Sequence, residues 1–283
     1  MIAFLGTGLL GSNFARAALR RGEQVQVWNR SIERARPLEA EGARVFAQAA
    51  DAVRGASRVH IALSDDAAVE AVLAQALPGV EPSAIIVDHT TTSPSGARAR
   101  YERFAGKRPA FQHAPVFMGP QNALEATGVM LISGAAAQVE RLRPELAKMT
   151  GKLVELGPEP DRAAKFKLLG NLFLMFMTAG VGEVLSLAKA LGIEAQDAAM
   201  LFDVFNPGAT LPARVARILA PGANPSWELQ MARKDARLML EAADAGGVPL
   251  QVLPSIAAIM DSYIAAGAAH EDWTVIARSA LGG

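Results

Sequence analysis

The sequence predicts an α/β fold, with a doubly wound parallel sheet in the N-terminal part and an all-α domain after it. Three observations support this prediction. Short apolar runs alternate with helical patterns up to about residue 156, a cluster of glycines follows the first run directly, and helical periodicity alone continues after about residue 161. Gly157 and Pro158 mark the boundary, so the predicted domains are residues 1–160 and 161–283.

The first thirty residues predict a dinucleotide-binding unit of the Rossmann type. Ile2–Leu5 reads as a strand, a helical pattern follows through Leu19, and Val25–Trp28 reads as a second strand. A G-x-G-x-x-G motif lies in the turn between the first strand and the helix, which is the context that a dinucleotide site requires. The residues expected at the cofactor here are Gly6, Gly8, Leu9, Leu10 and Gly11.

Each glycine of the motif has a physical role in this prediction. Gly6 allows the tight turn, Gly8 lets the pyrophosphate approach the backbone, and Gly11 lets the helix pack closely on the sheet. Free N–H groups and the helix dipole would favour the pyrophosphate at the helix N-terminus. The alternative is a glycine-rich turn without a ligand, and the complete strand-helix-strand pattern argues against it.

The end of the second strand indicates which dinucleotide binds. Proteins that choose NAD commonly place a carboxylate there for the ribose hydroxyls, whereas this chain has Asn29-Arg30-Ser31. Arg30 can pair with a phosphate, and the side chains of Asn29 and Ser31 can donate hydrogen bonds to it. We therefore expect NADP(H), the alternative being that Arg30 is an ordinary solvated arginine.

The composition narrows the class of protein. The 283 residues are 51% hydrophobic, and 28 basic residues balance 28 acidic ones, so nucleic acid is not an expected partner. There is no cysteine, which excludes a disulfide framework and a thiol nucleophile, and no metal site is expected. Because a strand begins at the N-terminus, we expect no signal peptide and a cytoplasmic location.

The segment Leu168–Leu187 is the most apolar of the chain and has to be weighed as a membrane span. Asn171 and Glu183 would be costly in lipid. Burial between two domains or two subunits explains the segment better, so no membrane partner is expected.

The remaining elements are expected in an alternating order. The predicted helices are Ile32–Glu41, Gln48–Gly55, a helix through Val69 and Val72, Ser95–Phe104 and Ala137–Met149. The predicted strands are residues 43–46, Arg58–Leu63, Ala84–Asp88, Phe111–Val116, Val129–Gly134 and Leu153–Leu156.

Polar residues follow two of these strands, where a ligand would bind at the carboxyl edge of a parallel sheet. Leu63, Ser64 and Asp65 end one strand and are expected beside the cofactor. Thr91 follows the next one and is expected to contact cofactor and substrate. The alternative in both places is that the hydroxyl and carboxyl groups only cap the helices that follow.

Lys167 is the candidate proton donor. It begins the apolar helix and shares one face with Asn171, four residues later. Partial burial would lower the pKa of its ammonium toward the range of a general acid, and the alternative is a lysine that extends to solvent at a helix end. His60 and His113 are expected to be structural, His60 as a satisfied core residue.

Trp227 and the Lys234-Asp235 pair lie in one expected helical stretch, two turns apart. One helix face could therefore present both to a pocket. A tryptophan in a helix is more often a core residue, so this interpretation has a structural alternative.

Taken together, these features resemble the β-hydroxyacid dehydrogenase family, the relatives of 3-hydroxyisobutyrate and 6-phosphogluconate dehydrogenases, and among them the glyoxylate and succinic semialdehyde reductases. The similarity extends over essentially the whole chain. Its markers are Gly6-x-Gly8-x-x-Gly11, Asp88-x-Thr90-Thr91-x-x-Pro94, Ala114-Pro115-Val116, Ala126-x-Gly128, Ala164-Lys165-x-Lys167 with Asn171, and Lys234-Asp235.

The resemblance implies NADP(H)-dependent reduction of an aldehyde or ketone, such as a semialdehyde, with Lys167 as general acid or base. It implies that Asn171 orients the substrate and that Thr91, Trp227 and Asp235 contribute to the substrate site. The cofactor site would also include Lys234. Members of the family often assemble through a long interdomain helix, so a homodimer or homotetramer is expected.

Two departures from the family pattern concern the substrate site. The family usually has Ser-Gly-Gly where this chain has Phe117-Met118-Gly119, and Gly170 replaces the first of two common asparagines. A hydroxyl that would hold a substrate carboxylate is therefore missing, and the alternatives are a more apolar carbonyl compound or an acid that is held in a different way. The alternatives are an NADPH-dependent enzyme like the imine reductases, and a non-catalytic cofactor-binding scaffold. Retention of Lys167 argues against both.

Overall fold

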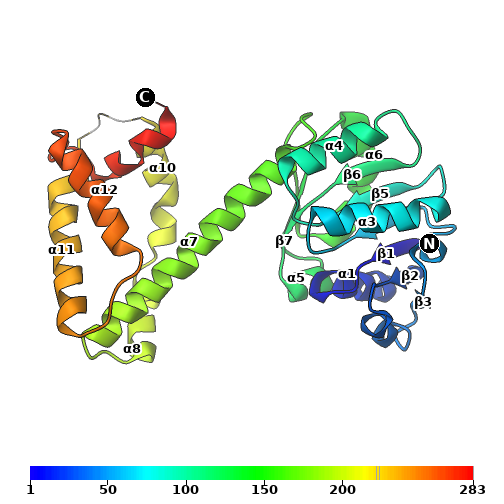
Figure 1. Cartoon of the computed structure of the whole chain (residues 1–283), viewed down its shortest axis with the longest axis horizontal. Coiled ribbons are helices and arrows are strands. Elements are labelled where there is room, and N and C mark those ends of the chain that lie inside the picture. The colour runs from blue at the N-terminus through cyan, green and yellow to red at the C-terminus, as the bar shows by residue number, and fades with distance from the viewer. Residues whose placement is uncertain (221, 223, 283) are drawn as a thin grey trace. The chain divides into compact units, whose positions relative to one another are not determined.

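The computed structural model describes residues 1–220, 222 and 224–282, and the chain divides into two compact units (Figure 1). The first unit is Met1–Leu172 and the second is Phe173–Gly283. The division falls within the 29-residue helix α7 (Arg162–Ala190), which begins just after the predicted domain boundary at residue 160.

A six-stranded parallel sheet forms the centre of the first unit, in the order β3-β2-β1-β4-β5-β6. The chain proceeds from β1 to one edge and then returns to β4 on the other side of β1. Ligands of such sheets bind at this switch point, outside the carboxyl ends of the strands. The strands are β1 (Ile2–Leu5), β2 (Val25–Trp28), β3 (Arg44–Phe46), β4 (Arg58–Ile61), β5 (Ile85–Asp88) and β6 (Ala110–His113).

The register of the sheet brings the strand ends into one row. Leu5 pairs with Trp28 on one side and with Ile61 on the other, and Ile61 pairs with Asp88. The turns that follow β1, β2, β4 and β5 therefore begin at the same edge. This edge is where the sequence predicts the cofactor.

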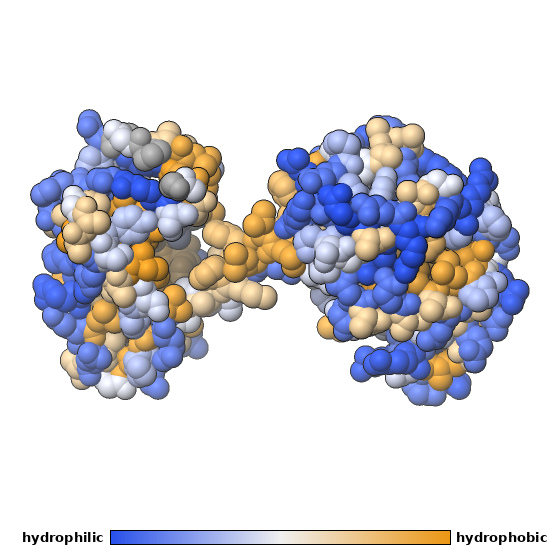
Figure 2. All heavy atoms as spheres, turned by 45° about the horizontal axis from the view of Figure 1, so that its top comes forward, coloured by the Kyte–Doolittle hydropathy of each residue, from blue (hydrophilic) through white to orange (hydrophobic). Residues whose placement is uncertain are grey.

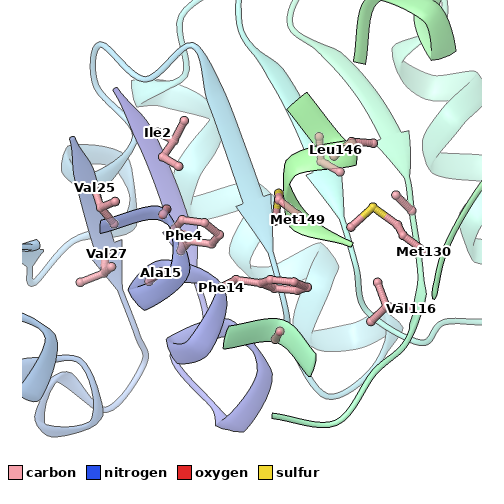
Figure 3. Packing of buried hydrophobic residues seen from close by; sticks show 14 of the residues in the cluster. Ile2, Phe4, Phe14, Ala15, Val25, Val27, Val116, Met130, Leu146 and Met149 are labelled. Carbon is pink, nitrogen blue, oxygen red and sulfur yellow. The ribbon is translucent and has the colours of Figure 1, made fainter. Parts of the chain in front are cut away.

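Helices cover both faces of this sheet, and each face has its own hydrophobic core. Alternation along β1 sends Ile2 and Phe4 to one face and Leu5 to the other. Figure 3 shows Phe4 of β1 beside Phe14 of the first helix. The helices of the first unit are α1 (Leu9–Arg20), α2 (Ala49–Ala52), α3 (Asp66–Ala76), α4 (Pro94–Phe104), α5 (Pro120–Glu125) and α6 (Ala136–Leu146), with 3-10 turns at Leu77–Gly79 and Ala147–Met149.

The helix predicted over Ile32–Glu41 is wrong. The segment forms two short 3-10 turns, Ile32–Arg34 and Arg36–Leu38. Pro37 explains the difference, because proline has no N–H to donate and disfavours helical geometry in the residue before it.

The strand predicted over Phe111–Val116 is wrong in its extent, because it divides between two sheets. The first part is β6, and Val116–Phe117 forms β7, which belongs to a three-stranded sheet of order β7-β8-β9 with β8 (Val129–Ile132) and β9 (Lys152–Glu155). Pro115 lies between the two strands and cannot donate a ladder hydrogen bond. This break places Phe117 outside the main sheet.

The second unit is helical, as the sequence predicts. Its core is formed by Leu229, Ala232, Ala236, Ala257, Met260, Ala268 and Val275. Trp227 precedes α11, which begins at Leu229, so the prediction that Trp227 and Lys234 share one helical stretch is wrong. Its helices after α7 are α8 (Ala195–Ala199), α9 (Leu201–Val204), α10 (Leu211–Leu219), α11 (Leu229–Ala245) and α12 (Leu253–Ala265), with 3-10 segments at Pro207–Thr210 and Trp273–Leu281.

Helix α7 carries apolar side chains that the single chain leaves exposed. Leu169, Met175 and Phe176 are 61%, 69% and 61% exposed. Figure 2 shows hydrophobic residues in orange along this helix, and α7 is, within the described part of the chain, the one helix long and apolar enough to cross a membrane. Length and composition alone are weak evidence for a span.

Candidate active site

A cleft of about 590 Å³ lies at the carboxyl edge of the six-stranded sheet, and all of its lining residues belong to the first unit. It brings together most of the residues that the sequence predicts for the cofactor and substrate. The predicted residues that line it are Gly6, Gly8, Leu9, Leu10, Gly11, Asn29, Arg30, Ser31, Leu63, Ser64, Thr91, Met118 and Lys167.

The glycines of the first turn show why larger residues would not fit. Gly6 has a φ of +98°, and a Cβ there would lie 2.3 Å from the carbonyl oxygen of Ala62. A Cβ on Gly11 would lie 2.0 Å from the carbonyl oxygen of Gly6. Gly8 differs, because a Cβ there would meet no atom within 4 Å. The turn is thus packed against the protein at two glycines and open at the third, which fits a pyrophosphate at the start of α1.

The turn after β2 is held to the glycine turn by Asn29. Its Oδ1 accepts a hydrogen bond from the N–H of Thr7 at 3.0 Å, and its Nδ2 donates to the carbonyl of Ser31 at 2.9 Å. One side chain therefore holds together the turns that follow β1 and β2.

Arg30 is exposed at the rim of the cleft, and the structure adds Arg34, which the sequence analysis missed. Within the part of the chain that the structure describes, neither guanidinium forms an ion pair with an acidic side chain. Arg34 belongs to the segment whose structure was wrongly predicted as a helix. The feature of the sequence that could have indicated Arg34 is that it follows Arg30 by four residues.

The residues after β4 divide between the two interpretations given above. Leu63 and Ser64 line the cleft, whereas Asp65 caps α3 and accepts a hydrogen bond from the N–H of Ala68 at 2.8 Å. That backbone hydrogen bond is the main cause that lowers the pKa of the Asp65 carboxyl. Since Asp65 is not among the residues that line the cleft, its role at the cofactor stays a prediction.

The turn after β5 contributes Thr91, which is exposed and lines the cleft, and two residues that the sequence analysis did not assign to the cofactor, His89 and Thr90. The Oγ1 of Thr90 accepts a hydrogen bond from the N–H of Leu63 at 3.1 Å. This bond joins the ends of β4 and β5 beside the cleft.

A pair of buried histidines lies under this edge. Nδ1 of His89 donates to the carbonyl of Ala114 at 2.7 Å, so its Nε2 accepts the hydrogen bond from Nδ1 of His60 at 3.0 Å. Burial lowers the pKa of His89 to about 4 and that of His60 well below its usual value. His60 is a core residue as predicted, but the description "satisfied" is wrong, because its Nε2 has no partner among the residues described.

Lys167 lies in the wall of the cleft and is only 8% exposed. Its Nζ donates a hydrogen bond to Oδ1 of Asn171 at 2.8 Å and lies 4.3 Å from the centre of the Phe117 ring. Burial lowers the pKa of this ammonium, in the direction that the sequence predicts. Lys165 behaves differently, because its Nζ pairs with Glu159 at 3.0 Å.

The other predicted residues do not line this cleft. Phe117 and Gly119 flank Met118, which lines the cleft, and the Phe117 ring contacts Lys167. Trp227, Lys234 and Asp235 belong to the second unit, where the Trp227 ring lies 5.5 Å from that of Trp273 and Nζ of Lys234 lies 2.7 Å from Oδ1 of Asp235. Their roles at a substrate or cofactor stay predictions. Within the described residues, no group of three or more histidine or acidic side chains could hold a metal ion.

Comparison with known proteins identifies the family. Residues 1–157 match the model of the NAD binding domain of 6-phosphogluconate dehydrogenase. Residues 162–280 match the model described as the NAD-binding domain of NADP-dependent 3-hydroxyisobutyrate dehydrogenase. The chain therefore belongs to the β-hydroxyacid dehydrogenase family and is an NAD(P)-dependent oxidoreductase that acts on a small molecule.

Individual relatives agree with this assignment. The chain is 26% identical to 3-sulfolactaldehyde reductase of Escherichia coli over 280 residues, which cover 97% of this chain and 94% of the relative. It is 25% identical to the mitochondrial 3-hydroxyisobutyrate dehydrogenase of Drosophila melanogaster, with 97% and 87% covered.

A solved structure supports the fold. The imine reductase of Myxococcus stipitatus in complex with NADP⁺ has a TM-score of 0.89 at 20% identity, over 98% of this chain and 99% of that one. The predicted fold class and enzyme class are thus confirmed. NADP(H), the predicted cofactor, is confirmed by the family match, whereas the role of Arg30 remains a prediction.

Proposed function

We propose that the protein reduces an aldehyde or ketone with NADPH, and that Lys167 donates the proton to the carbonyl oxygen. The substrates considered are semialdehydes and the carbonyl compounds that correspond to hydroxy acids, the kinds of compound for which the relatives are named. In the reverse direction Lys167 would act as the base. The observation that carries the proposal is the hydrogen-bonded pair of Lys167 and Asn171 beside the glycine-lined cleft.

The proposed cofactor seat runs along the carboxyl edge of the sheet. The open face at Gly8 would receive the pyrophosphate, and Arg30, helped by Ser31 and Arg34, would receive the 2′-phosphate. Thr91 and Met118 line the part of the cleft that includes Lys167. NADPH, when bound, supplies the hydride to the carbonyl carbon.

Lys167 suits proton transfer for two reasons. Its burial lowers the pKa of the ammonium, which makes release of the proton easier. The acceptor oxygen of Asn171, 2.8 Å from Nζ, holds the ammonium on one side and leaves its other protons available to a substrate. Asn171 thereby positions the donor, and its own amide N–H groups could bind a substrate oxygen.

The assembly and location proposed for the enzyme are those expected from the sequence. We propose domains 1–160 and 161–283, with Trp227, Lys234 and Asp235 of the second contributing to substrate and cofactor binding. The exposed apolar side chains of α7 support a homodimer or homotetramer, because contiguous apolar surface on this scale marks an interaction site. We propose a cytoplasmic enzyme without nucleic-acid or membrane partners.

The test replaces Lys167 with alanine and measures oxidation of NADPH with aldehyde substrates. We expect turnover to fall roughly a hundredfold or more, the usual contribution of a positioned general acid. NADPH binding, measured by fluorescence titration, should change little. Lys165→Ala is the matched control, because Lys165 lies on the same helix turn but pairs with Glu159 outside the cleft.

Either of two results would contradict the proposal. The first is a Lys167→Ala enzyme that binds NADPH and reduces aldehydes as fast as the wild type. The second is a wild type that turns over a cyclic imine but no aldehyde, which would favour the alternative like the imine reductases.

A further inference from the structure

Phe117 and Gly170 are fitted to one another in the first unit. A Cβ on Gly170 would lie 2.2 Å from Cζ and 2.5 Å from Cε1 of the Phe117 ring. Because real Cβ atoms do not approach other atoms so closely, the ring can lie here only if residue 170 has no side chain. The aromatic ring thus fills the space that a side chain of α7 would take.

The position of this ring affects the surroundings of the proposed proton donor. Gly170 lies between Lys167 and Asn171 on the first turns of α7, and Nζ of Lys167 lies 4.3 Å from the ring centre. The ring presents its face to the ammonium, which is a favourable cation–π arrangement. An apolar wall therefore stands beside Lys167 on the side of β7.

Few groups near this wall could bind an anion. Phe117 has no hydroxyl, Pro120 has no N–H, and the N–H of Gly119 already donates to Oδ1 of Asn122 at 2.9 Å. The cations that line the cleft are Arg30, Arg34 and Lys167. The first two are assigned to the 2′-phosphate of the cofactor, and the proposed reaction needs Lys167 at the carbonyl oxygen.

The other nearby cation is already paired. Nζ of Lys165 lies 3.0 Å from Glu159 and 3.3 Å from Asp161. A substrate carboxylate placed against the Phe117 ring would lose water and would find no free cation there, which is costly.

We infer that the Phe117–Gly170 pair sets the substrate class of this enzyme, and that the enzyme selects carbonyl compounds whose substituent against the Phe117 ring is uncharged and apolar over those that carry a carboxylate there. This inference rests on the proposed function and narrows its substrate class. Phe117 acts as a specificity determinant, because it excludes the anion and takes no part in the proton transfer.

The first experiment compares succinic semialdehyde with its methyl ester, which differs mainly in the charge of the acid group. With saturating NADPH, we expect kcat/KM for the ester to exceed that for the acid by about 10- to 100-fold, since an unpaired polar group in a site commonly has an effect of this size. The wild-type enzyme alone gives this ratio, so the test does not depend on any variant.

Variants then test whether the preference for the ester depends on the Phe117–Gly170 pair. In Phe117→Ser/Gly170→Asn the ring is removed and both positions gain polar groups, so we expect the ester preference to fall at least about tenfold or to reverse. Phe117→Leu is the matched control, because it removes the ring but adds no hydrogen-bonding group, and it should keep the preference for the ester.

The outcomes separate this inference from the proposed function. Wild-type turnover of the acid equal to or faster than that of the ester overturns the inference and leaves the proposed reduction intact. An ester preference that the double variant and Phe117→Leu change equally also overturns the assignment to this pair. NADPH binding without turnover of either aldehyde overturns the proposed function itself, and this inference with it.

Discussion

Lys167 shows how far a single residue can be interpreted from its neighbours in sequence. The spacing of four residues to Asn171 predicts one shared helix face, and the structure gives a hydrogen bond of 2.8 Å between their side chains. The apolar run after Lys167 predicts a partly desolvated ammonium, and burial does lower its pKa. The contact with Phe117 was not predictable, because 50 residues separate the two positions and the break at Pro115 brings them together.

Arg30 is the residue predicted to make the enzyme prefer NADPH over NADH. We expect Arg30→Ala to raise KM for NADPH by about tenfold or more and to leave KM for NADH nearly unchanged, because only NADPH has the 2′-phosphate that a guanidinium can bind. Steady-state kinetics with both cofactors measure this difference. Arg54→Ala is a control, since Arg54 is exposed and pairs with Asp51 away from the cleft. Equal changes for the two cofactors would remove Arg30 from the phosphate site.

At the scale of elements, β4 and β5 couple the cofactor cleft to a buried polar pair. His60 of β4 and His89, directly after β5, have nearly parallel rings with centres 5.3 Å apart, joined by the hydrogen bond described above. The ring of Phe4 of β1 stacks on His60, with centres 5.0 Å apart. His89 also lines the cleft. Both histidines remain neutral in the folded state at neutral pH, because burial disfavours their charged forms.

This pair makes stability depend on pH. The folded-state pKa of His89 is about 4, against 6.5 when unfolded, so the unfolded chain binds the proton first as pH falls. The contribution of His89 to the free energy of unfolding is therefore fully present above pH 6.5 and is lost toward pH 4, by on the order of 3 kcal/mol. Denaturant unfolding at several pH values measures this decline.

A variant isolates the contribution of His89. His89→Gln should flatten the decline between pH 6.5 and 4, whatever its effect on stability at neutral pH. His270→Gln is the control, because the side chain of His270 is 78% exposed. Burial raises the pKa of Asp88, so its contribution to the free energy of unfolding changes with pH in the opposite direction. The slope of the variant is therefore compared with that of the wild type. An unchanged slope in His89→Gln would contradict this explanation.

At the scale of the whole molecule, the exposed apolar side chains of α7 support the proposal that the chain assembles with further copies of itself. Leu172 and Phe176 lie one helical turn apart on α7 and are 52% and 61% exposed in the single chain. We expect a dimer or tetramer by light scattering, and a shift to monomer in Leu172→Glu/Phe176→Glu, because charges in an apolar interface lose hydration without gaining partners.

A control distinguishes this interface from any other apolar surface. Ile259→Glu makes the same change of charge on α12, at a residue that is 45% exposed, and should leave the oligomer intact. A wild-type protein that is monomeric, or that sediments with phosphatidylcholine vesicles, would contradict the assignment of α7 to a subunit interface.

Local patterns in the sequence determined the class of the fold and the cofactor edge. The glycine turn, the alternating elements and the polar residues after β4 and β5 are short-range features, and a parallel sheet places the ends of its strands at one edge by geometry. Two of the errors came from prolines: Pro37 replaced a helix by 3-10 turns, and Pro115 moved Phe117 into another sheet.

Tertiary structure alone decided which distant residues meet. Arg34 joins Arg30 at the cleft, His89 accepts a hydrogen bond from His60, and the ring of Phe117 fills the space beside Gly170. The sequence determined the glycine-lined edge and the Lys167–Asn171 pair, because turns and helices fix positions a few residues apart. It did not determine the shape of the substrate wall, because that depends on how side chains from separate elements pack together.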